Sequence, residues 1–543
     1  MATGVSTSKT AITYSSAARH ILTNPRFLLL LSALAVLGGV VLLLATHWGI
    51  GTSPDSIVYI TGARSLLIGQ GFSLPRGATF EPITHHAPLY SALLAAIGLV
   101  GLDPLEGARG LNVFLFGANI LLIGLMIARV TRSARWLSVL GSFLGLTSLT
   151  MLTVHVMAWT EPTFIFFSLL VFWLLTTYLE NSKRSILVGA AFLLSLALLT
   201  RYAGMALVVT GVLGLVLFSQ KPFVKRLVDG LAFGLLSSLP LGLWLLRNKM
   251  VAGTAANRDL LFHPVGRTHL WQATDTISSW LLIPSTAPGW IKLSLWSGMV
   301  LLLVALLGWV YRQQKFQHGQ SLLTFATHLP VLVRLLLLFL IIYSAFLVVS
   351  ISFLDANTPL DDRILSPVYV AGSILSMVLL HHLWGLIGQI RLLQVGVVIA
   401  LLIFSAVYLF RGLETVRVSY LQGLGFSSLA WQQSELLAHV RRLPAGKPIF
   451  TNSPEAIYLY TDKPARPMPK KFFAADQQVN PNYQAALTDI KKELQNGGVI
   501  VYFNTLVGIT SLATKDELEA ELQVCVLAHA SDGTIYGLAQ CPQ

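Results

Sequence analysis

Residues 27–46 read FLLLLSALAVLGGVVLLLAT, and this uncharged stretch decides the fold class. A helix that crosses a bilayer core of about 30 Å needs roughly 20 apolar residues, which is the length of this run. The run follows Lys9, Arg19 and Arg26 and is too long for the apolar part of a cleaved signal peptide. We therefore predict a retained first membrane helix with a cytoplasmic N-terminus.

Further apolar runs separated by short polar turns extend this pattern to residue 411. Only 11% of the 543 residues are charged, against about 25% in a soluble protein. The mean hydropathy of +0.69 likewise excludes a multi-domain water-soluble enzyme. We predict an α-helical polytopic membrane domain of about eleven spans in residues 1–411, the further spans lying near 107–128, 136–154, 162–179, 186–200, 203–218, 227–246, 291–311, 331–353, 367–383 and 392–410.

The basic charge of the chain follows a membrane pattern. The net charge is +13, yet residues 412–543 hold 11 Lys and Arg against 12 Asp and Glu, so the excess lies in the apolar part. When the spans alternate from a cytoplasmic N-terminus, the predicted inner loops are basic and the outer loops hold most of the acids. This asymmetry predicts an integral protein of the cell (inner) membrane with an outer C-terminus, and it gives no indication of nucleic-acid binding.

Two regions outside the spans are predicted to carry structure of their own. The long first outer loop, 47–106, contains two helical stretches, 54–70 and 87–102, that are too short to span and suit the membrane interface. Residues 412–543 have the composition of an extracytoplasmic α/β domain, with strands 448–451 and 499–503, helix 483–495 and a hairpin of 522–530 with 534–539. Cys525 and Cys541 fall on that hairpin and form either a disulfide or two buried thiols.

Three charges at predicted outer helix ends are candidates for chemistry, because a charge beside a membrane is costly and needs a reason. Asp55 follows Pro54 and either caps its helix or serves as a general base at the lip of a membrane cavity. Glu161 precedes Pro162, which also suits a simple helix start. Arg201 interrupts a long apolar stretch and either reaches lipid headgroups or binds an anion in a cavity.

Other charged or titratable residues at the same face have weaker signals. His85 and His86 are adjacent and lack metal-ligand spacing, so solvated side chains are the simpler interpretation. Arg258 and Arg267 lie in the second outer loop, 247–290. Together with the acids Asp55 and Glu161, they are the kind of charges that would bind a lipid substrate with a phosphate group. The chain has neither a Walker loop nor a dinucleotide fingerprint, which argues against a nucleotide-driven pump.

Several short motifs, spread in order through the membrane part, resemble the GT-C membrane glycosyltransferases. The resemblance is to the bacterial branch similar to protein O-mannosyltransferases and lipid A aminoarabinose transferases (glycosyltransferase family 39-like). The matching motifs are Asp55-Ser56-Ile57-Val58-Tyr59, Gly69-Gln70-Gly71, His86-Ala87-Pro88-Leu89-Tyr90, Ala108-Arg109-Gly110-Leu111-Asn112, Thr160-Glu161-Pro162, Thr200-Arg201-Tyr202, Leu245-Leu246-Arg247-Asn248 and Asp362-Arg363.

The resemblance implies a transferase that moves a monosaccharide from a polyprenyl-phosphate carrier to a protein, lipid or glycan acceptor at the outer face of the membrane. It implies that Asp55 is the general base and that Tyr59, Glu161 and Asp362 bind substrate. The carrier phosphate would be bound by His86, Arg201, Arg258 and Arg267. The resemblance implies no certain cofactor; in some relatives a divalent metal is held at the positions of His85 and His263.

The sequence departs from the family pattern at three positions and leaves two other functions open. Ser56 stands where the eukaryotic protein mannosyltransferases have a second acid, and Ala87 replaces a proline. His86 carries a conditional charge where a lysine would be permanently charged. A transporter or flippase of lipid-linked saccharides would carry charges at the membrane midplane and internal repeats, neither of which is evident. A non-catalytic membrane scaffold is the second alternative.

Overall fold

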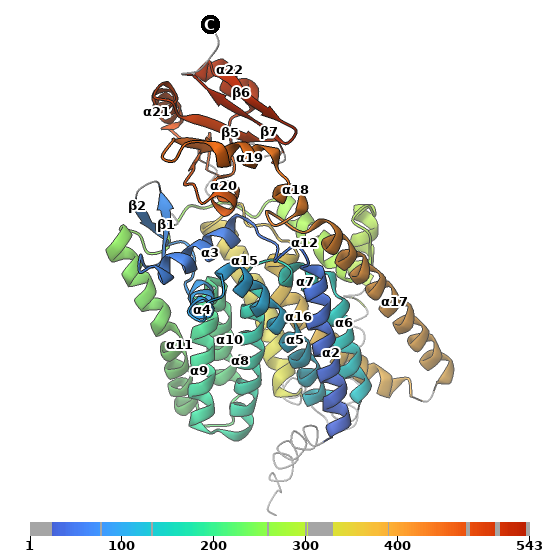
Figure 1. Cartoon of the computed structure of the whole chain (residues 1–543). Coiled ribbons are helices and arrows are strands. Elements are labelled where there is room, and N and C mark those ends of the chain that lie inside the picture. The colour runs from blue at the N-terminus through green and yellow to red at the C-terminus, as the bar shows by residue number, and fades with distance from the viewer. Residues whose placement is uncertain are drawn as a thin grey trace, which may run out of the picture.

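The computed structural model describes residues 24–538 except 77–78, 132–133, 258–259, 299–300, 302–328, 389, 474–477, 505 and 507–510. Its helices pack into a bundle, and a sheet domain formed by the C-terminal part of the chain stands on one end of that bundle (Figure 1). Helices α3 (Pro54–Leu67) and α4 (Leu89–Gly98) and the hairpin of β1 (Ser73–Arg76) with β2 (Thr79–Pro82) lie at the same end of the bundle (Figure 1). This end is called the outer end below.

Seven described helices are long and apolar enough to cross a membrane, and their bounds follow the predicted runs. They are α2 (Pro25–Ala45), α5 (Pro104–Thr131), α8 (Glu161–Asn181), α11 (Phe223–Ala252), α15 (Val331–Phe353), α16 (Asp362–Leu386) and α17 (Arg391–Gln422). The predicted span at 136–154 is instead two helices, α6 (Arg135–Thr147) and α7 (Leu149–His155), that meet at 55°. Helices α9 (Arg184–Thr200) and α10 (Met205–Phe218) are apolar but shorter. The predicted span at 291–311 lies largely outside the described residues.

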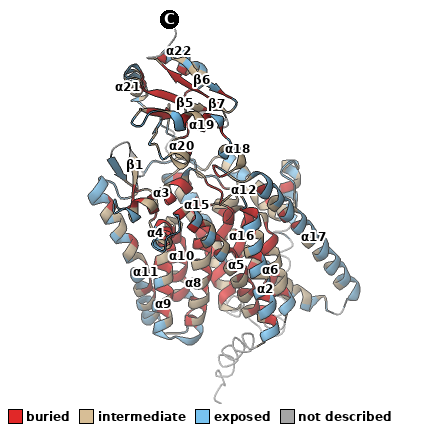
Figure 2. Cartoon of the chain, in the orientation of Figure 1, coloured by how far each residue is buried: buried red, intermediate tan, exposed pale blue. Residues whose placement is uncertain are grey.

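Burial differs between central and peripheral helices of the bundle (Figure 2). In the most apolar stretches of α5 and α8, 61% of residues are buried, whereas the corresponding share in α17 is 6%. The outward face of α17 exposes large apolar side chains such as Leu392, Leu402 and Phe410. A continuous apolar exterior of this kind is unstable in water and suits lipid. The chain is therefore an integral membrane protein.

The first outer loop folds much as predicted, with additions. Its two interfacial helices are α3 (Pro54–Leu67) and α4 (Leu89–Gly98), and a hairpin of β1 (Ser73–Arg76) with β2 (Thr79–Pro82) stands between them. The second outer loop contains a helix that the sequence analysis did not predict, α12 (Arg267–Trp280). This helix has a polar composition and therefore contains no apolar run of the kind that predicts a span.

The C-terminal domain has a five-stranded mixed sheet in the order β4-β3-β5-β7-β6. Strands β3 (Ile449–Thr451), β4 and β5 (Val499–Phe503) are parallel, whereas β7 (Gly533–Gly537) is antiparallel to β5 and to β6 (Cys525–Ala530). Five helices and the remaining strand complete the domain: α18 (Leu429–Gln432), α19 (Glu435–Arg442), α20 (Pro454–Thr461), β4 (Arg466–Pro467), α21 (Tyr483–Gln495) and α22 (Lys515–Leu522).

The boundary of this domain and its cysteines bear on two sequence expectations. Helix α17 runs through residue 411, where the sequence analysis placed the division, and ends only at Gln422. Cys525 lies on β6 and is disulfide-bonded, and Cys541 lies outside the described residues.

The C-terminal domain docks on the first outer loop. Ile57 of α3 packs in one apolar cluster with Phe426 and with Ala456 of α20. Beside this cluster the backbone at Gly425 pairs with Thr52, and a side chain at Gly425 would lie 1.9 Å from the Thr52 carbonyl oxygen. Glycine is therefore required at this contact. The domain thus supports the segment that leads into α3.

Candidate active site

Asp55 lies in the first turn of α3, and its carboxylate points to a cation rather than to the helix amides. The cap is Ser53, whose hydroxyl accepts from the Ser56 amide while the Ser56 hydroxyl accepts from the Ser53 amide. The Asp55 Oδ2 atom lies 2.8 Å from Nη1 of Arg363, and the side chain is 38% exposed. Of the two roles considered for Asp55, capping therefore belongs to Ser53, and Asp55 is left with a half-buried ion pair.

Arg363 joins the two acids of the site. It lies in the first turn of α16, and its Nε is 2.6 Å from Oε1 of Glu161. Its guanidinium also lies over the ring of Trp159, 4.6 Å from the centroid. The indole Nε1 of Trp159 donates to Ser53 Oγ at 2.8 Å, which ties this aromatic platform to the start of α3. Arg363 is thus held on three sides.

Glu161 and Arg201 complete an alternating row of charges. The Glu161 side chain is 1% exposed at the start of α8, and it is ion-paired with Arg201 as well as with Arg363. Arg201, at the end of α9, also donates from Nη1 to Thr160 Oγ1 at 3.1 Å. A buried carboxylate is stable only when it is paired. The row Asp55–Arg363–Glu161–Arg201 meets this requirement with two acids and two guanidinium groups.

His86 and Tyr59 border Asp55 on its other side. The His86 Nε2 lies 3.9 Å from Asp55 Oδ1, and its Nδ1 lies 3.3 Å from the Tyr59 hydroxyl. We assign the Tyr59 hydroxyl as donor to Nδ1, which leaves the Nε2–H of His86 facing the carboxylate. Burial, with the nearby charge of Asp55, raises the pKa of Tyr59, so it stays protonated. Tyr59 therefore orients the imidazole.

The charges around Asp55 control its protonation. Burial by itself raises the pKa of the Asp55 carboxyl, but the positive charge of Arg363, followed by that of His86, outweighs burial and holds the pKa below its ordinary value. Asp55 is therefore ionised at neutral pH. An ionised carboxylate can accept a proton from a hydroxyl, but it is a weak base while Arg363 remains bound to it.

The structure thus brings five predicted residues together and leaves others elsewhere. Tyr59, His86, Glu161 and Arg201 gather around Asp55. The Asp362 carboxylate is instead bound by Thr150 Oγ1 at 2.5 Å and by Trp280 Nε1 at 3.0 Å. Arg267 is exposed at the start of α12 and has no ion pair within the part of the chain that the structure describes, and Arg258 lies outside that part.

The metal expected from the resemblance has no cluster of ligands in the described ranges. No three or more His, Cys, Asp or Glu side chains come close enough there to hold an ion. The ring of His85 packs beside that of His86 with centroids 4.1 Å apart, and His263 lines a separate cavity. The pair His85 and His263 stays a prediction.

Arg363 is the central residue that the sequence analysis did not assign. Its signal was present, because Asp361-Asp362-Arg363 places three consecutive charges before an apolar helix. Successive helical residues point about 100° apart, so a run of three charges does not say which one faces the site. Substrate binding was predicted for Asp362, whereas Arg363, the next residue, is the one that forms an ion pair with Asp55.

Helix α12 holds the segment that leads to Arg363. Three of its side chains, spaced along one face, bind residues 356–362: His269 Nε2 lies 3.0 Å from the Ala356 oxygen, Thr276 Oγ1 donates to the Leu360 oxygen at 2.9 Å, and Trp280 binds Asp362. Residues at these spacings share one side of a helix. Asp362 thus anchors α12 beside the site.

Comparisons by sequence find no relative, since no family model and no curated protein matches the chain. Comparison by structure does find similar proteins. ArnT from Cupriavidus metallidurans in the apo state is similar with a TM-score of 0.57 and 14% identity, over 93% of this chain and 97% of that one. ArnT from the same organism bound to undecaprenyl phosphate gives 0.56 and 14%, over 96% and 100%.

An archaeal structure shows a more distant likeness. The oligosaccharyltransferase of Archaeoglobus fulgidus, in complex with Zn and sulfate, has a TM-score of 0.50 and 10% identity, over 87% of this chain and 68% of that one. Both proteins are GT-C membrane glycosyltransferases. At such low identity the likeness concerns the fold alone, and at that level it confirms the resemblance read from the motifs. This chain has the GT-C fold.

Proposed function

We propose that the protein is a glycosyltransferase that moves a monosaccharide from a polyprenyl-phosphate carrier to an acceptor at the outer face of the inner membrane. The observation that carries the proposal is the half-buried Asp55 beside Arg363 and His86 at the outer end of an apolar bundle. A lipid-linked sugar needs its tail in hydrocarbon and its ring in water, and a site at a membrane–water boundary meets both needs. A structure of the same fold with bound undecaprenyl phosphate supports this choice of ligand.

In the proposed reaction the acceptor oxygen attacks the anomeric carbon and the carbon–oxygen bond to the carrier phosphate breaks. The phosphate leaves with the bonding electrons, and Asp55 takes the proton of the acceptor hydroxyl. Arg201 and Arg363 each retain N–H donors beyond those bound to Glu161 and Asp55, and His86 presents its Nε2–H to the same space. Such donors stabilise a departing phosphate by about 2–4 kcal/mol each when well placed.

Arg363 gives the proposed site a way to activate its base. A carrier phosphate that enters the site competes with Asp55 for the guanidinium, because its two free oxygens can accept both N–H groups of one edge and it gains negative charge as the bond to the sugar breaks. Movement of Arg363 toward the phosphate would remove the main charge that lowers the pKa of Asp55. Asp55 would then become a stronger base only when the donor is bound.

The remaining assignments extend this proposal. The N-terminus is cytoplasmic and the C-terminal domain is extracytoplasmic, as the charge asymmetry predicts. Tyr59 and Glu161 act by orienting His86 and the two arginines, and Asp362 acts through α12. Arg258 and Arg267 remain candidates for binding the carrier phosphate, and the acceptor is a hydroxyl-bearing protein, lipid or glycan.

Replacement of Asp55 tests the proposal. We expect Asp55→Asn to lower sugar transfer from a labelled polyprenyl-phosphate sugar by about 10²-fold or more, because asparagine cannot take the proton. Transfer is measured as the carrier phosphate released by purified protein in lipid nanodiscs. Asp103→Asn is the matched control, since Asp103 is an outer-loop acid that pairs with Arg64 away from the site. Near-normal turnover of Asp55→Asn would reject the assignment of the base.

A further inference from the structure

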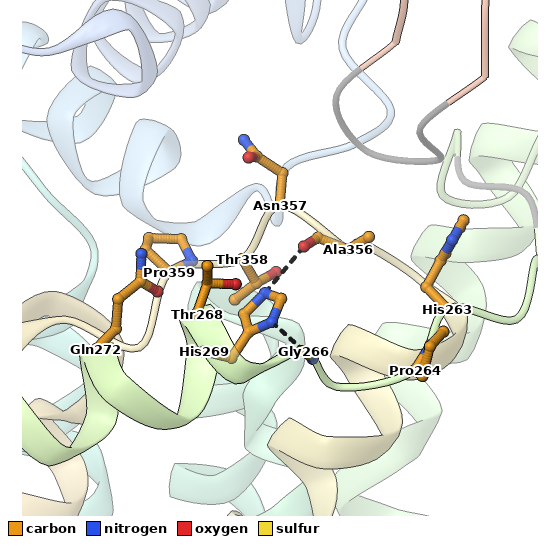
Figure 3. Close-up of a pocket in the computed structure, with 10 residues that line it drawn as sticks. All are labelled: His263, Pro264, Gly266, Thr268, His269, Gln272, Ala356, Asn357, Thr358 and Pro359. Atoms are coloured by element: carbon orange, nitrogen blue, oxygen red, sulfur yellow. Dashed lines mark hydrogen bonds between the residues drawn. The ribbon is translucent and has the colours of Figure 1, made fainter.

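A cavity of about 600 Å³ lies between the first turns of α12 and the segment before α16 (Figure 3). Its lining comes from the second outer loop and from residues 356–359, and it includes His263, Thr268, His269, Asn357, Thr358 and Pro359. We propose that this cavity binds an uncharged sugar ring of a substrate. The inference rests on the proposed function, and it narrows the substrate class.

The position of the cavity suits a group attached near the reacting atoms. Pro359 lines the cavity, and Arg363 follows it four residues later in the chain. A chain advances at most about 3.6 Å per residue, so the cavity edge lies within roughly 14 Å of Arg363. A sugar bound here remains within reach of the phosphate and acceptor positions of the proposed site.

The lining matches a neutral ligand rather than a charged one. Among the residues that the structure describes, the lining contains no Asp, Glu, Lys or Arg. A phosphate would require cations and a protonated amino sugar would require a carboxylate, whereas a neutral sugar needs only uncharged donors and acceptors. Thr268, Asn357 and Thr358 supply both kinds of group. Over the described parts of the chain, no hydrogen bond uses the side chains of these three residues.

The amide of Gly266, which precedes the first turn of α12, is not available to a ligand. The Gly266 amide donates to Nδ1 of His269 at 3.3 Å, so this N-terminal donor is already occupied. Since Nδ1 accepts, the hydrogen of His269 is on Nε2, which donates to the Ala356 oxygen at 3.0 Å (Figure 3). His269 therefore joins both sides of the cavity through these two hydrogen bonds. A preformed cavity of this volume is in the range of small-ligand sites.

The test compares carriers with and without a sugar. We expect wild-type protein in nanodiscs to bind polyprenyl-phosphate mannose roughly tenfold more tightly than bare polyprenyl phosphate, with a smaller gain for a carrier that bears a protonated amino sugar. Thr268→Val combined with Asn357→Ala should abolish the mannose gain and leave the binding of bare carrier unchanged. Thr274→Val is the matched control, because its hydroxyl is bound within α12 to the Leu270 oxygen. Thermal unfolding confirms that each variant is folded.

A second probe separates the two sources of the sugar. Saturation-transfer NMR with maltotriose, with and without bare carrier, reports an acceptor sugar in the cavity. Loss of the mannose gain in the double variant assigns the cavity to the donor, and loss of the maltotriose signal alone assigns it to the acceptor. If the double variant changes neither readout, the cavity does not bind a sugar. Failure of bare carrier to bind at all would instead overturn the proposed function, and the maltotriose readout would still decide the cavity.

Discussion

The two ends of the helical bundle both carry ion pairs, but they are built differently. At the end opposite the C-terminal domain, Arg129 pairs with Glu180 at 2.7 Å and Lys221 pairs with Asp229 at 2.8 Å. Within the described part of the chain, each of these acids forms one ion pair. At the outer end Glu161 is shared by two arginines, and Arg363 is shared by two acids. Simple pairs neutralise charge, whereas a shared row with a half-exposed member is suited to exchange one partner for a ligand.

The largest effect that tests this contrast is expected at Arg363. Arg363→Gln should lower sugar transfer by about 10²- to 10³-fold, because both the phosphate contact and the placement of Asp55 are lost. It should also destabilise the fold by about 3 kcal/mol, since Glu161 stays buried with one partner fewer. Turnover and thermal unfolding in nanodiscs measure the two effects. Arg363→Lys, which keeps the charge, should retain most of the stability but not the bridge between the acids. Equal turnover of the lysine variant and wild type would contradict the bridging role.

The pH dependence of transfer is the next effect in size. Arg363 holds the pKa of Asp55 below its ordinary value of about 4, so kcat/KM of the free enzyme should decline only below that pH. In Arg363→Gln burial acts without that opposing charge, and the decline should move to higher pH. The free energy of unfolding should change in the same direction. Because the pKa of Asp55 is lower in the folded state than in the unfolded state, its ionisation stabilises the fold above the unfolded-state pKa, and this stabilisation is lost as the pH falls. An unchanged acidic limb in the variant would show that Asp55 does not limit the rate.

A smaller effect is expected from the support that α12 provides. Trp280→Phe removes the hydrogen bond to Asp362 and should lower kcat about 3- to 10-fold, because Arg363 loses part of its alignment. The KM for the carrier should stay unchanged, since Trp280 does not contact the proposed phosphate position. Steady-state kinetics distinguish this result from a general loss of folded protein. Asp362→Asn should resemble Trp280→Phe, and a rise in KM instead would indicate that Asp362 binds substrate.

The smallest effect is expected at the opposite end of the bundle. Lys221→Met breaks the pair with Asp229 and removes the contact with Tyr178, and it should lower the Tm by a few degrees. Transfer should stay within about twofold of wild type at a temperature where both proteins are folded. A large loss of turnover would mean that the two ends of the bundle are coupled, and the contrast drawn between them would fail.

Prediction from the sequence was most accurate where the pattern is local. Helix α21 and strand β5 have the predicted bounds, and α15 matches its apolar run. The bend between α6 and α7 was not predicted, because Ser148 caps α7 within a run whose hydropathy is unbroken. Helix α12 was also not predicted, since it is polar and its partners lie in a distant loop. The resemblance identified Asp55, Tyr59, His86, Glu161 and Arg201, and the structure brought them together.

The amino-acid sequence alone determines that this chain enters a membrane and where most of its long apolar helices lie. Those properties depend on the length of apolar runs and on charge next to them, which are local quantities. Only the tertiary structure decides that Arg363 meets Glu161 across 202 residues of chain and then reaches Asp55. Contacts of this kind depend on how helices rotate and pack against one another, and a rotation of one residue would have turned Asp362 to the site in place of Arg363.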